Sequence, residues 1–163
     1  MISVIKTLDT LDSIRLAEIY DDFAIQLVKI LNTDNLLLDA LGSNKDKISV
    51  NEFIDYKSKW TRKNNGELFA ILLNNTAIGT ISLSHQNIEK SKAEIGYWIG
   101  SKYWGQGYTS RAFGQVLDYA RLKEFKYLHA KIKKDNIASL KIWEKYKADM
   151  ELIDDKFHVS LVL

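Results

Sequence analysis

The chain has 163 residues, of which 46% are hydrophobic and 27% charged, and its formal net charge is +2. Such a length and composition predict one domain with a sizeable core, spanning residues 1–163. The chain has no cysteine, which excludes disulfides, thiol nucleophiles and cysteine-metal sites. No apolar run reaches the roughly 20 residues of a membrane span, and the first residues lack the features of a signal peptide. We therefore expect a cytoplasmic protein with no membrane partner.

The small net charge argues against nucleic acid as a partner, because nucleic-acid-binding domains usually concentrate basic residues on one face. The one basic cluster is Lys131, Lys133 and Lys134. We interpret it as solvated lysines at a strand end. Contact with an anionic cofactor or RNA is the alternative.

The first half of the chain predicts a strand at 2–8 and then a helical region. Apolar residues of that region are spaced by three and four, at Leu11, Ile14, Ala17, Phe23, Leu27 and Leu31. Ser49 and Glu52 have the spacing of a capping box, which predicts a helix from there to about Lys63.

The second half predicts alternating strands and helices. The β-prone runs 67–73 and 77–84 are separated by Asn74, Asn75 and Thr76, and asparagine tolerates the left-handed backbone of a tight hairpin. Further strands are predicted at 93–99 and 127–132, helices at 109–123 and 136–146, and a terminal hairpin at 150–161. The pattern favours an α/β (α+β) fold with a mixed sheet and helices on its faces.

The segment 94–110, EIGYWIGSKYWGQGYTS, predicts an anion site between a strand and a helix. Glycines at 105 and 107 tolerate a positive φ, and the first helical amides lack partners within the helix. We expect the amides of Gly105, Gly107, Tyr108, Thr109 and Ser110 to bind a diphosphate. The turn lacks the GK[ST] ending of a Walker loop and the third glycine of a dinucleotide fingerprint. A ligand-free strand-to-helix turn is the alternative.

The same segment resembles the acyl-CoA loop of the GNAT acetyltransferases, R/Q-x-x-G-x-G/A. Gly107 stands at the first glycine position, and Trp104 and Thr109 depart from the general pattern in the style of the RimJ/RimL-type subgroup. Downstream, Asn136-Ile137-Ala138-Ser139 and Trp143-Glu144-Lys145 are similar to the N-x-x-S…EK segment of the family. The resemblance covers Glu67 to about Met150.

This resemblance implies a mostly antiparallel central sheet whose middle strands splay, with helices on both faces. It implies acetyl-CoA as cosubstrate and no metal. The splay would lie around Trp98 to Gly100 on one side, where the pantetheine arm would follow the backbone at Trp98 and Ile99. Asn136 and Trp143 would lie near the thioester. A helix N-cap is the plainer role for Asn136, and both roles are compatible.

Many family members have a tyrosine at the position of Trp143, where it is thought to protonate the departing thiolate. An indole N–H donates a hydrogen bond but has no accessible pKa. In the RimJ/RimL-type subgroup the serine that matches Ser139 is the proposed substitute, and a first-turn serine without chemistry is the alternative. Tyr146 fits core packing better than the role of a displaced acid.

Glu94 is the candidate base, because a carboxylate near the splay can accept the amine proton through water. A structural ion pair with a lysine is its alternative role. His85 is a second candidate base, and His129 is interpreted as a histidine on the sheet face. Lys147 stands where the family has a helix-ending glycine, so either the lysine adopts the left-handed conformation or the helix ends differently.

The sequence therefore predicts an acetyl-CoA-dependent N-acetyltransferase that transfers the acetyl group to a primary amine by direct attack. The acceptor stays open between a protein N-terminus and a small-molecule amine, and the assembly between monomer and homodimer. A non-catalytic acyl-CoA sensor of the same fold is the alternative function, suggested by Trp143 and Lys147.

Overall fold

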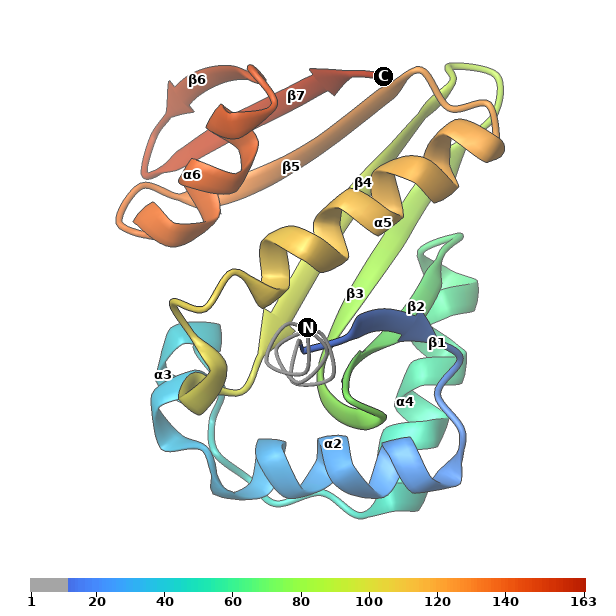
Figure 1. Cartoon of the computed structure of the whole chain (residues 1–163), viewed down its shortest axis with the longest axis vertical. Coiled ribbons are helices and arrows are strands. Elements are labelled where there is room, and N and C mark those ends of the chain that lie inside the picture. The colour runs from blue at the N-terminus through green and yellow to red at the C-terminus, as the bar shows by residue number, and fades with distance from the viewer. Residues whose placement is uncertain (1–11) are drawn as a thin grey trace, which may run out of the picture.

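The computed structural model describes residues 12–163, so the strand expected at 2–8 lies outside the described residues. Seven strands form one sheet in the order β1-β2-β3-β4-β5-β7-β6 (Figure 1). They are β1 (Ile14–Ala17), β2 (Glu67–Leu73), β3 (Thr76–Asn87), β4 (Lys92–Ile99), β5 (Tyr127–Lys133), β6 (Asp149–Ile153) and β7 (Lys156–Val162). Only the β4–β5 pair is parallel among these strands, which confirms the expected mixed, mostly antiparallel sheet.

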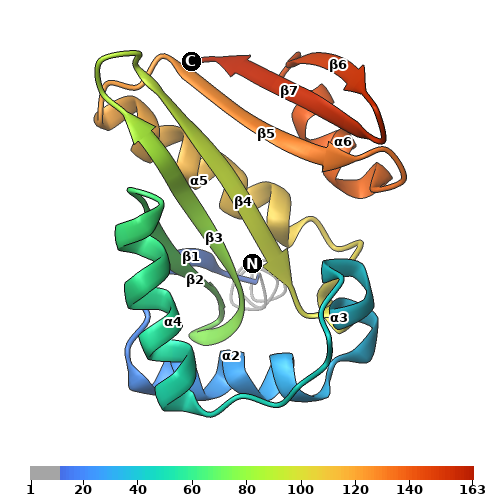
Figure 2. The same cartoon turned by 180° about the vertical axis from the view of Figure 1, so that it is seen from behind.

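Helices cover both faces of this sheet. They are α2 (Asp21–Thr33), α3 (Asn35–Leu41), α4 (Val50–Lys63), α5 (Tyr108–Leu122) and α6 (Ile137–Lys145), with a 3-10 turn η1 (Ser101–Tyr103). Figure 1 shows α5 and α6 in front of the sheet, and Figure 2 shows α2 and α4 on the other side. None of the helices between residues 12 and 163 is long and apolar enough to cross a bilayer.

The prediction of a helical region from residue 11 onward is wrong for residues 14–17. These residues form edge strand β1, antiparallel to β2, with Ile14 opposite Leu73. Ile14 and Leu16 are two residues apart, so they also fit the period of a strand, and four residues are too few for the period to decide. Pairing with the sheet decides instead, and the helix begins only at Asp21.

Two local predictions are confirmed, and the alternative left open at Lys147 is decided. Ser49 Oγ accepts a hydrogen bond from the Glu52 amide at 3.0 Å and begins α4. Asn74 and Asn75 have φ values of 47° and 72° and turn β2 into β3. Lys147 has φ 59°, so a lysine adopts the left-handed conformation at the end of α6.

The core between α5 and the sheet is as the sequence predicts. The apolar face of α5 is buried through Ala112, Phe113, Val116, Leu117 and Ala120. From α6, Leu140 and Trp143 join the same cluster. These contacts fix both helices on one face of β4 and β5.

Strands β4 and β5 separate after a short paired stretch. They pair only where Lys92–Glu94 lie opposite Tyr127–His129. Beyond this point β4 stays with β3 while β5 stays with β7, and a gap opens between the ribbons (Figures 1 and 2). The splay expected near Trp98 to Gly100 therefore begins earlier, at Ile95, and one backbone edge of residues 95–99 has no strand partner within the described chain.

Candidate active site

Successive side chains of β4 point to opposite faces of the sheet. Tyr97 points to the α5 face, where its ring meets that of Phe113 edge to face at 6.2 Å. Trp98 packs on the other face, in the cluster that α2 and α4 cover. Glu94 shares the face of Trp98. The splay therefore has Tyr97 on one side and Glu94 on the other.

The turn before α5 has the geometry of an anion site. Gly105 and Gly107 have φ values of 72° and 81°, and a Cβ at either position would meet nothing within 4 Å. Gly107 is the N-cap of α5, so the amides of Tyr108, Thr109 and Ser110 have no partner inside the helix. Within residues 12–163 none of the amides of 105–110 donates to a protein acceptor. An open surface of free amides fits a diphosphate.

Side chains outside the turn hold it in place. Asp34, at the N-cap of α3, accepts hydrogen bonds from the amide and hydroxyl of Ser101 at 2.6 and 2.7 Å. Burial acts to raise the pKa of Asp34, but the hydrogen bonds from Ser101 and Leu37 outweigh it and lower that pKa. Trp104 donates its indole N–H to the Ile99 carbonyl at 3.0 Å. Trp104 therefore satisfies the last carbonyl of β4. This is a structural role that does not require Trp104 to contact an anion.

The first turn of α6 faces the same splay. Asn136 caps this helix, because its side-chain oxygen accepts a hydrogen bond from the Ser139 amide at 3.2 Å. Ser139 is 6% exposed, and its hydroxyl contacts the hydroxyl of Tyr97. Trp143 is fully buried against Phe113, with ring centroids 5.0 Å apart.

The indole N–H of Trp143 is a buried donor with no hydrogen-bond partner in the described part of the chain. Burial raises the pKa of the nearby Tyr97 hydroxyl, and the neighbouring Ser139 and Trp143 groups act in the opposite direction. The net effect keeps Tyr97 protonated at neutral pH. Its proton is therefore available for donation to a hydrogen bond.

Glu94 lies on the opposite face beside two histidines. Its carboxylate is 3.4 Å from His85 Nδ1, and it stands in register with His129 on β5. Among residues 12–163 the ionic contact of Glu94 is thus with a histidine and not with a lysine. The Glu94 side chain is 35% exposed, so water reaches it. Burial lowers the pKa of His129, although Glu94 opposes this shift, and the imidazole therefore favours its neutral form.

A groove of about 350 Å³ continues from His129 across the sheet. It lies on the face of β5, β7 and β6 away from α6, where Figure 2 shows no helix over the strands. Its polar lining consists of His129, Lys131, Asp149, Glu151, His158 and Ser160. Acidic and imidazole groups thus lie next to the candidate base.

The structure brings most of the predicted site residues to the edges of the splay. The backbone of Trp98 and Ile99 lies along the opening, but the Trp98 side chain packs away from Ser139. Sequence reasoning missed Tyr97, which it treated only as part of a motif, and Asp34. The odd spacing between Glu94 and Tyr97 could have placed the tyrosine on the Ser139 face, whereas no local pattern points to Asp34.

Comparisons with known proteins agree with this geometry. The family model described as an acetyltransferase (GNAT) domain matches residues 14–149. The uncharacterized N-acetyltransferase p20 of Bacillus licheniformis is 32% identical over 77 residues, which span 45% of this chain and 43% of that protein. YkkB of Bacillus subtilis is 28% identical over 144 residues, which span 86% of this chain and 84% of that protein.

Solved structures of low sequence identity share the fold. RimJ of Mycobacterium smegmatis, in complex with a CoA disulfide, has a TM-score of 0.79 at 18% identity, covering 91% of this chain and 81% of that one. RimL, a ribosomal-protein α-N-acetyltransferase in complex with CoA, has a TM-score of 0.73 at 19% identity, covering 93% and 94%. With the family match over most of its length, the chain belongs to the GNAT acetyltransferase family.

Proposed function

We propose that this protein is an acetyl-CoA-dependent N-acetyltransferase that acts on a primary amine by direct attack, and that residues 1–163 form a single catalytic domain. The observation that supports the proposal best is the splay. At the splay, a buried pair of hydroxyls, Tyr97 and Ser139, lies on one face of the sheet. A hydrated carboxylate, Glu94, lies on the opposite face. A group reacting in the gap has a hydrogen-bond donor on one side and a proton acceptor on the other.

The cosubstrate is assigned to the α5 and α6 side. The free amides of 105–110 would bind the diphosphate, and the unpaired edge of 95–99 would hydrogen-bond the pantetheine arm. Asn136 would act through its cap, which orients the first turn of α6. Acetyl-CoA supplies the acetyl group as a thioester, so the protein needs mainly to hold donor and acceptor in line.

The acceptor is assigned to the opposite face. Glu94 would accept the proton of the ammonium group through water and so release the nucleophilic amine. The groove beside it contains Asp149 and Glu151, for which no ion pair is formed in the described chain. These carboxylates favour an acceptor that carries positive charge. RimL, which shares the fold, acts on a ribosomal protein, so a protein N-terminus is one acceptor class. A small cationic amine is the other.

A decisive experiment incubates the protein with radiolabelled acetyl-CoA and a lysate separated into protein and small-molecule pools, beside an enzyme-free control. Enzyme-dependent label in either pool supports acetyl transfer and identifies the acceptor class. The Glu94→Gln variant should lose this label.

The second candidate function is acyl-CoA binding without turnover, for which the indole at position 143 is the motivating feature. CoA binding by calorimetry together with no label in either pool would favour it. Absence of CoA binding would contradict both candidates.

A further inference from the structure

His85 has a backbone conformation that is uncommon for a residue with a side chain. Its φ is 49°, in the left-handed region, although it lies within β3. The pairing of β3 with β4 shifts register at the same place, between Ser84 and Asn87. Such a β-bulge is common next to active sites, where it redirects a side chain.

The bulge brings the imidazole of His85 to the face of Glu94. Ser84 lies opposite Glu94 in the β3–β4 pair, so regular alternation would turn the next side chain, that of His85, toward α5. Instead, His85 Nδ1 lies 3.1 Å from Ser84 Oγ and 3.4 Å from Glu94 Oε2. The left-handed backbone therefore breaks the alternation and places a histidine beside the candidate base.

The chain that follows α4 holds the bulge in place. The His85 amide donates a hydrogen bond to the Asn64 carbonyl at 2.6 Å, and the Gln86 amide donates one to the Asn65 carbonyl at 3.1 Å. The side-chain amide of Asn65 in turn donates to the Gln86 carbonyl at 2.6 Å. A residue other than glycine keeps a left-handed conformation only where its surroundings enforce it, and such residues cluster at functional sites.

Of the two histidines near Glu94, His85 has the greater access to water. Its side chain is 52% exposed, and within residues 12–163 its Nε2 makes no hydrogen bond. His129 stands in register with Glu94 but is less exposed. Burial lowers the pKa of His129, and the positive charges of Lys92 and Lys131 add to this shift. His85 is therefore the better placed of the two to exchange a proton with solvent.

We propose that His85 is the proton exit of the active site: its imidazole takes the proton that Glu94 removes from the acceptor amine and passes it to bulk water. The inference rests on the proposed function and deepens it. Glu94 remains the base. His85 acts through Glu94 and is a positioning residue for the proton, and the bulge in β3 is the feature that puts it there.

The bond changes balance with one proton released in each turnover. The ammonium group of the acceptor gives one proton to Glu94 through water, and the free amine attacks the thioester. Nδ1 of the neutral imidazole accepts this proton from Glu94, and Nε2 releases one to water. The C–N bond forms and the C–S bond breaks, with its electron pair on sulfur. The second proton of the nitrogen reaches the thiolate through water.

The test compares His85→Asn with wild type. Asparagine tolerates a positive φ but has no titratable group, so the variant keeps the bulge and lacks the imidazole. The measurement is the initial rate of transfer from radiolabelled acetyl-CoA to the lysate pool that becomes labelled. We expect kcat to fall about tenfold, less than for loss of the base itself, with KM for acetyl-CoA unchanged. Free imidazole in the buffer should restore most of the lost rate and leave wild type unaffected.

Ser91→Asn is the matched control. Ser91 also has a positive φ, 53°, but it lies in the turn before β4. This variant should keep the wild-type rate with and without imidazole. His85→Gly provides a second test if His85→Asn fails to fold, because glycine adopts a positive φ without strain. It should show the same loss and the same rescue.

A double variant separates a proton exit from an independent role. Because His85 acts through Glu94, His85→Asn should lower kcat no further in a Glu94→Gln background. Multiplicative losses would overturn the proposal, as would an unchanged rate in His85→Asn or a loss that imidazole does not restore. Absence of label with the wild-type protein would instead contradict the proposed function, and this inference with it.

Discussion

Glu94 owes its proposed role to its position on the strand. Trp98 lies an even number of positions along β4 from it and Tyr97 an odd number, so the alternation of side chains puts Glu94 on the face of Trp98, away from Ser139. Its partial exposure and its contact with His85 leave a route for a proton to reach bulk water. In the proposed site, the acceptor amine and the CoA sulfur therefore meet polar groups on different faces of one sheet.

We predict that Glu94→Gln lowers kcat by about 10²-fold to 10³-fold, in the usual range for loss of a general base. The loss should shrink at high pH, where the free amine no longer needs a base. The measurement is kcat against pH for wild type and variant. Glu89→Gln, an exposed glutamate in the turn before β4, is the matched control and should behave as wild type. A loss of equal size at all pH values would show that Glu94 does not act as the base.

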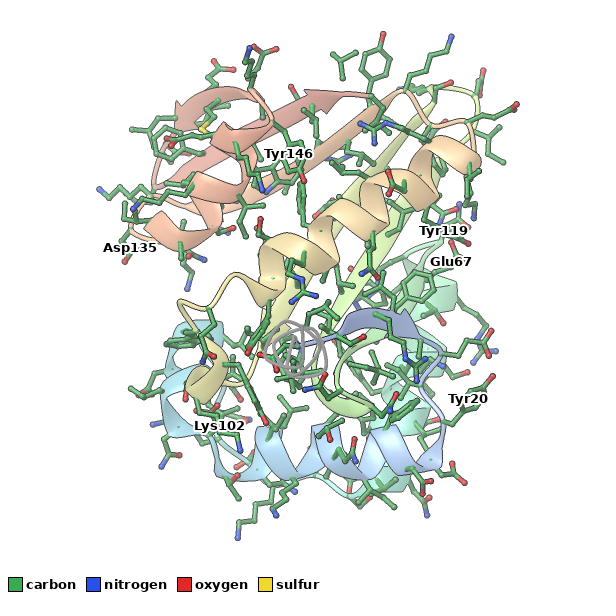
Figure 3. All side chains as sticks on the ribbon, viewed as in Figure 1. Tyr20, Glu67, Lys102, Tyr119, Asp135 and Tyr146 are labelled. Carbon is green, nitrogen blue, oxygen red and sulfur yellow. The ribbon has the colours of Figure 1, made fainter. Side chains whose placement is uncertain are left out.

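Tyr119 and Glu67 form a separate polar cluster at the far end of α5 (Figure 3). Tyr119 donates a hydrogen bond to Glu67 Oε1 at 2.5 Å, and Lys123 contacts Glu67 Oε2 at 2.9 Å. Burial, then the hydrogen bond and the negative charge of Glu67, raise the pKa of Tyr119 to about 12. The cluster joins the C-terminal turns of α5 to the start of β2.

This cluster predicts an alkaline loss of stability. The folded protein holds the Tyr119 proton up to about pH 12, whereas the unfolded chain releases it near pH 10. The stabilisation is therefore complete below pH 10 and is lost as pH rises from there to about 12. Urea midpoints between pH 8 and 11.5 should fall more steeply in wild type than in Tyr119→Phe. Equal slopes would contradict the prediction.

At the scale of elements, close packing between β3 and β4 depends on one glycine. A Cβ at Gly79 would lie 2.1 Å from the Trp98 carbonyl oxygen and 2.7 Å from Ile99 Cα, both backbone atoms. These atoms border the splay. A side chain at position 79 would therefore push β4 away from β3. The backbone of β4 is part of the proposed cosubstrate site.

We predict that Gly79→Ala lowers the free energy of unfolding by about 3 kcal/mol, at the upper end for overpacking. Gly42→Ala separates this clash from backbone strain. Gly42 has φ 67° with nothing within 4 Å of a Cβ, so its alanine variant should lose only about 1 kcal/mol. Denaturant unfolding of both variants measures the difference. Equal losses would show that the β3–β4 contact relaxes.

Most elements could be predicted from the sequence because their signals are local. The apolar face of α5, the asparagine turn after β2 and the Ser49 cap each require only a few neighbouring residues. Strand β1 could not be predicted in this way, because four residues carry too little periodicity and pairing with β2 decides their conformation.

The residues of the candidate site fall into the same two groups. The glycine turn and the Asn136 cap can be predicted from short motifs. The contact of Tyr97 with Ser139 joins residues 42 positions apart, and that of Asp34 with Ser101 joins residues 67 apart. These pairs exist only through the sheet order and helix packing, and a single sequence does not display that information.

At the scale of the whole molecule, the proposed cosubstrate site draws on three separate elements. The turn at 105–107 precedes α5, the open backbone belongs to β4, and Ser139 belongs to α6, which lies beyond the gap with β5 (Figure 1). A ligand that spans all three would bridge the two halves of the splayed sheet. Its binding energy should therefore stabilise the fold as a whole.

We predict that CoA at about 100 times its dissociation constant raises the free energy of unfolding by about 2.7 kcal/mol, which corresponds to an increase in Tm of roughly 5 to 10 °C. Gly107→Ala should shift this response to CoA concentrations at least about tenfold higher, because a methyl group at φ 81° strains the turn and projects where phosphate would approach the amides. Thermal unfolding with CoA and with pantetheine, which lacks the diphosphate, makes the comparison. The variant should respond normally to pantetheine if the turn binds the diphosphate. Equal weakening toward both ligands would instead mean that Gly107 supports the site only through the fold.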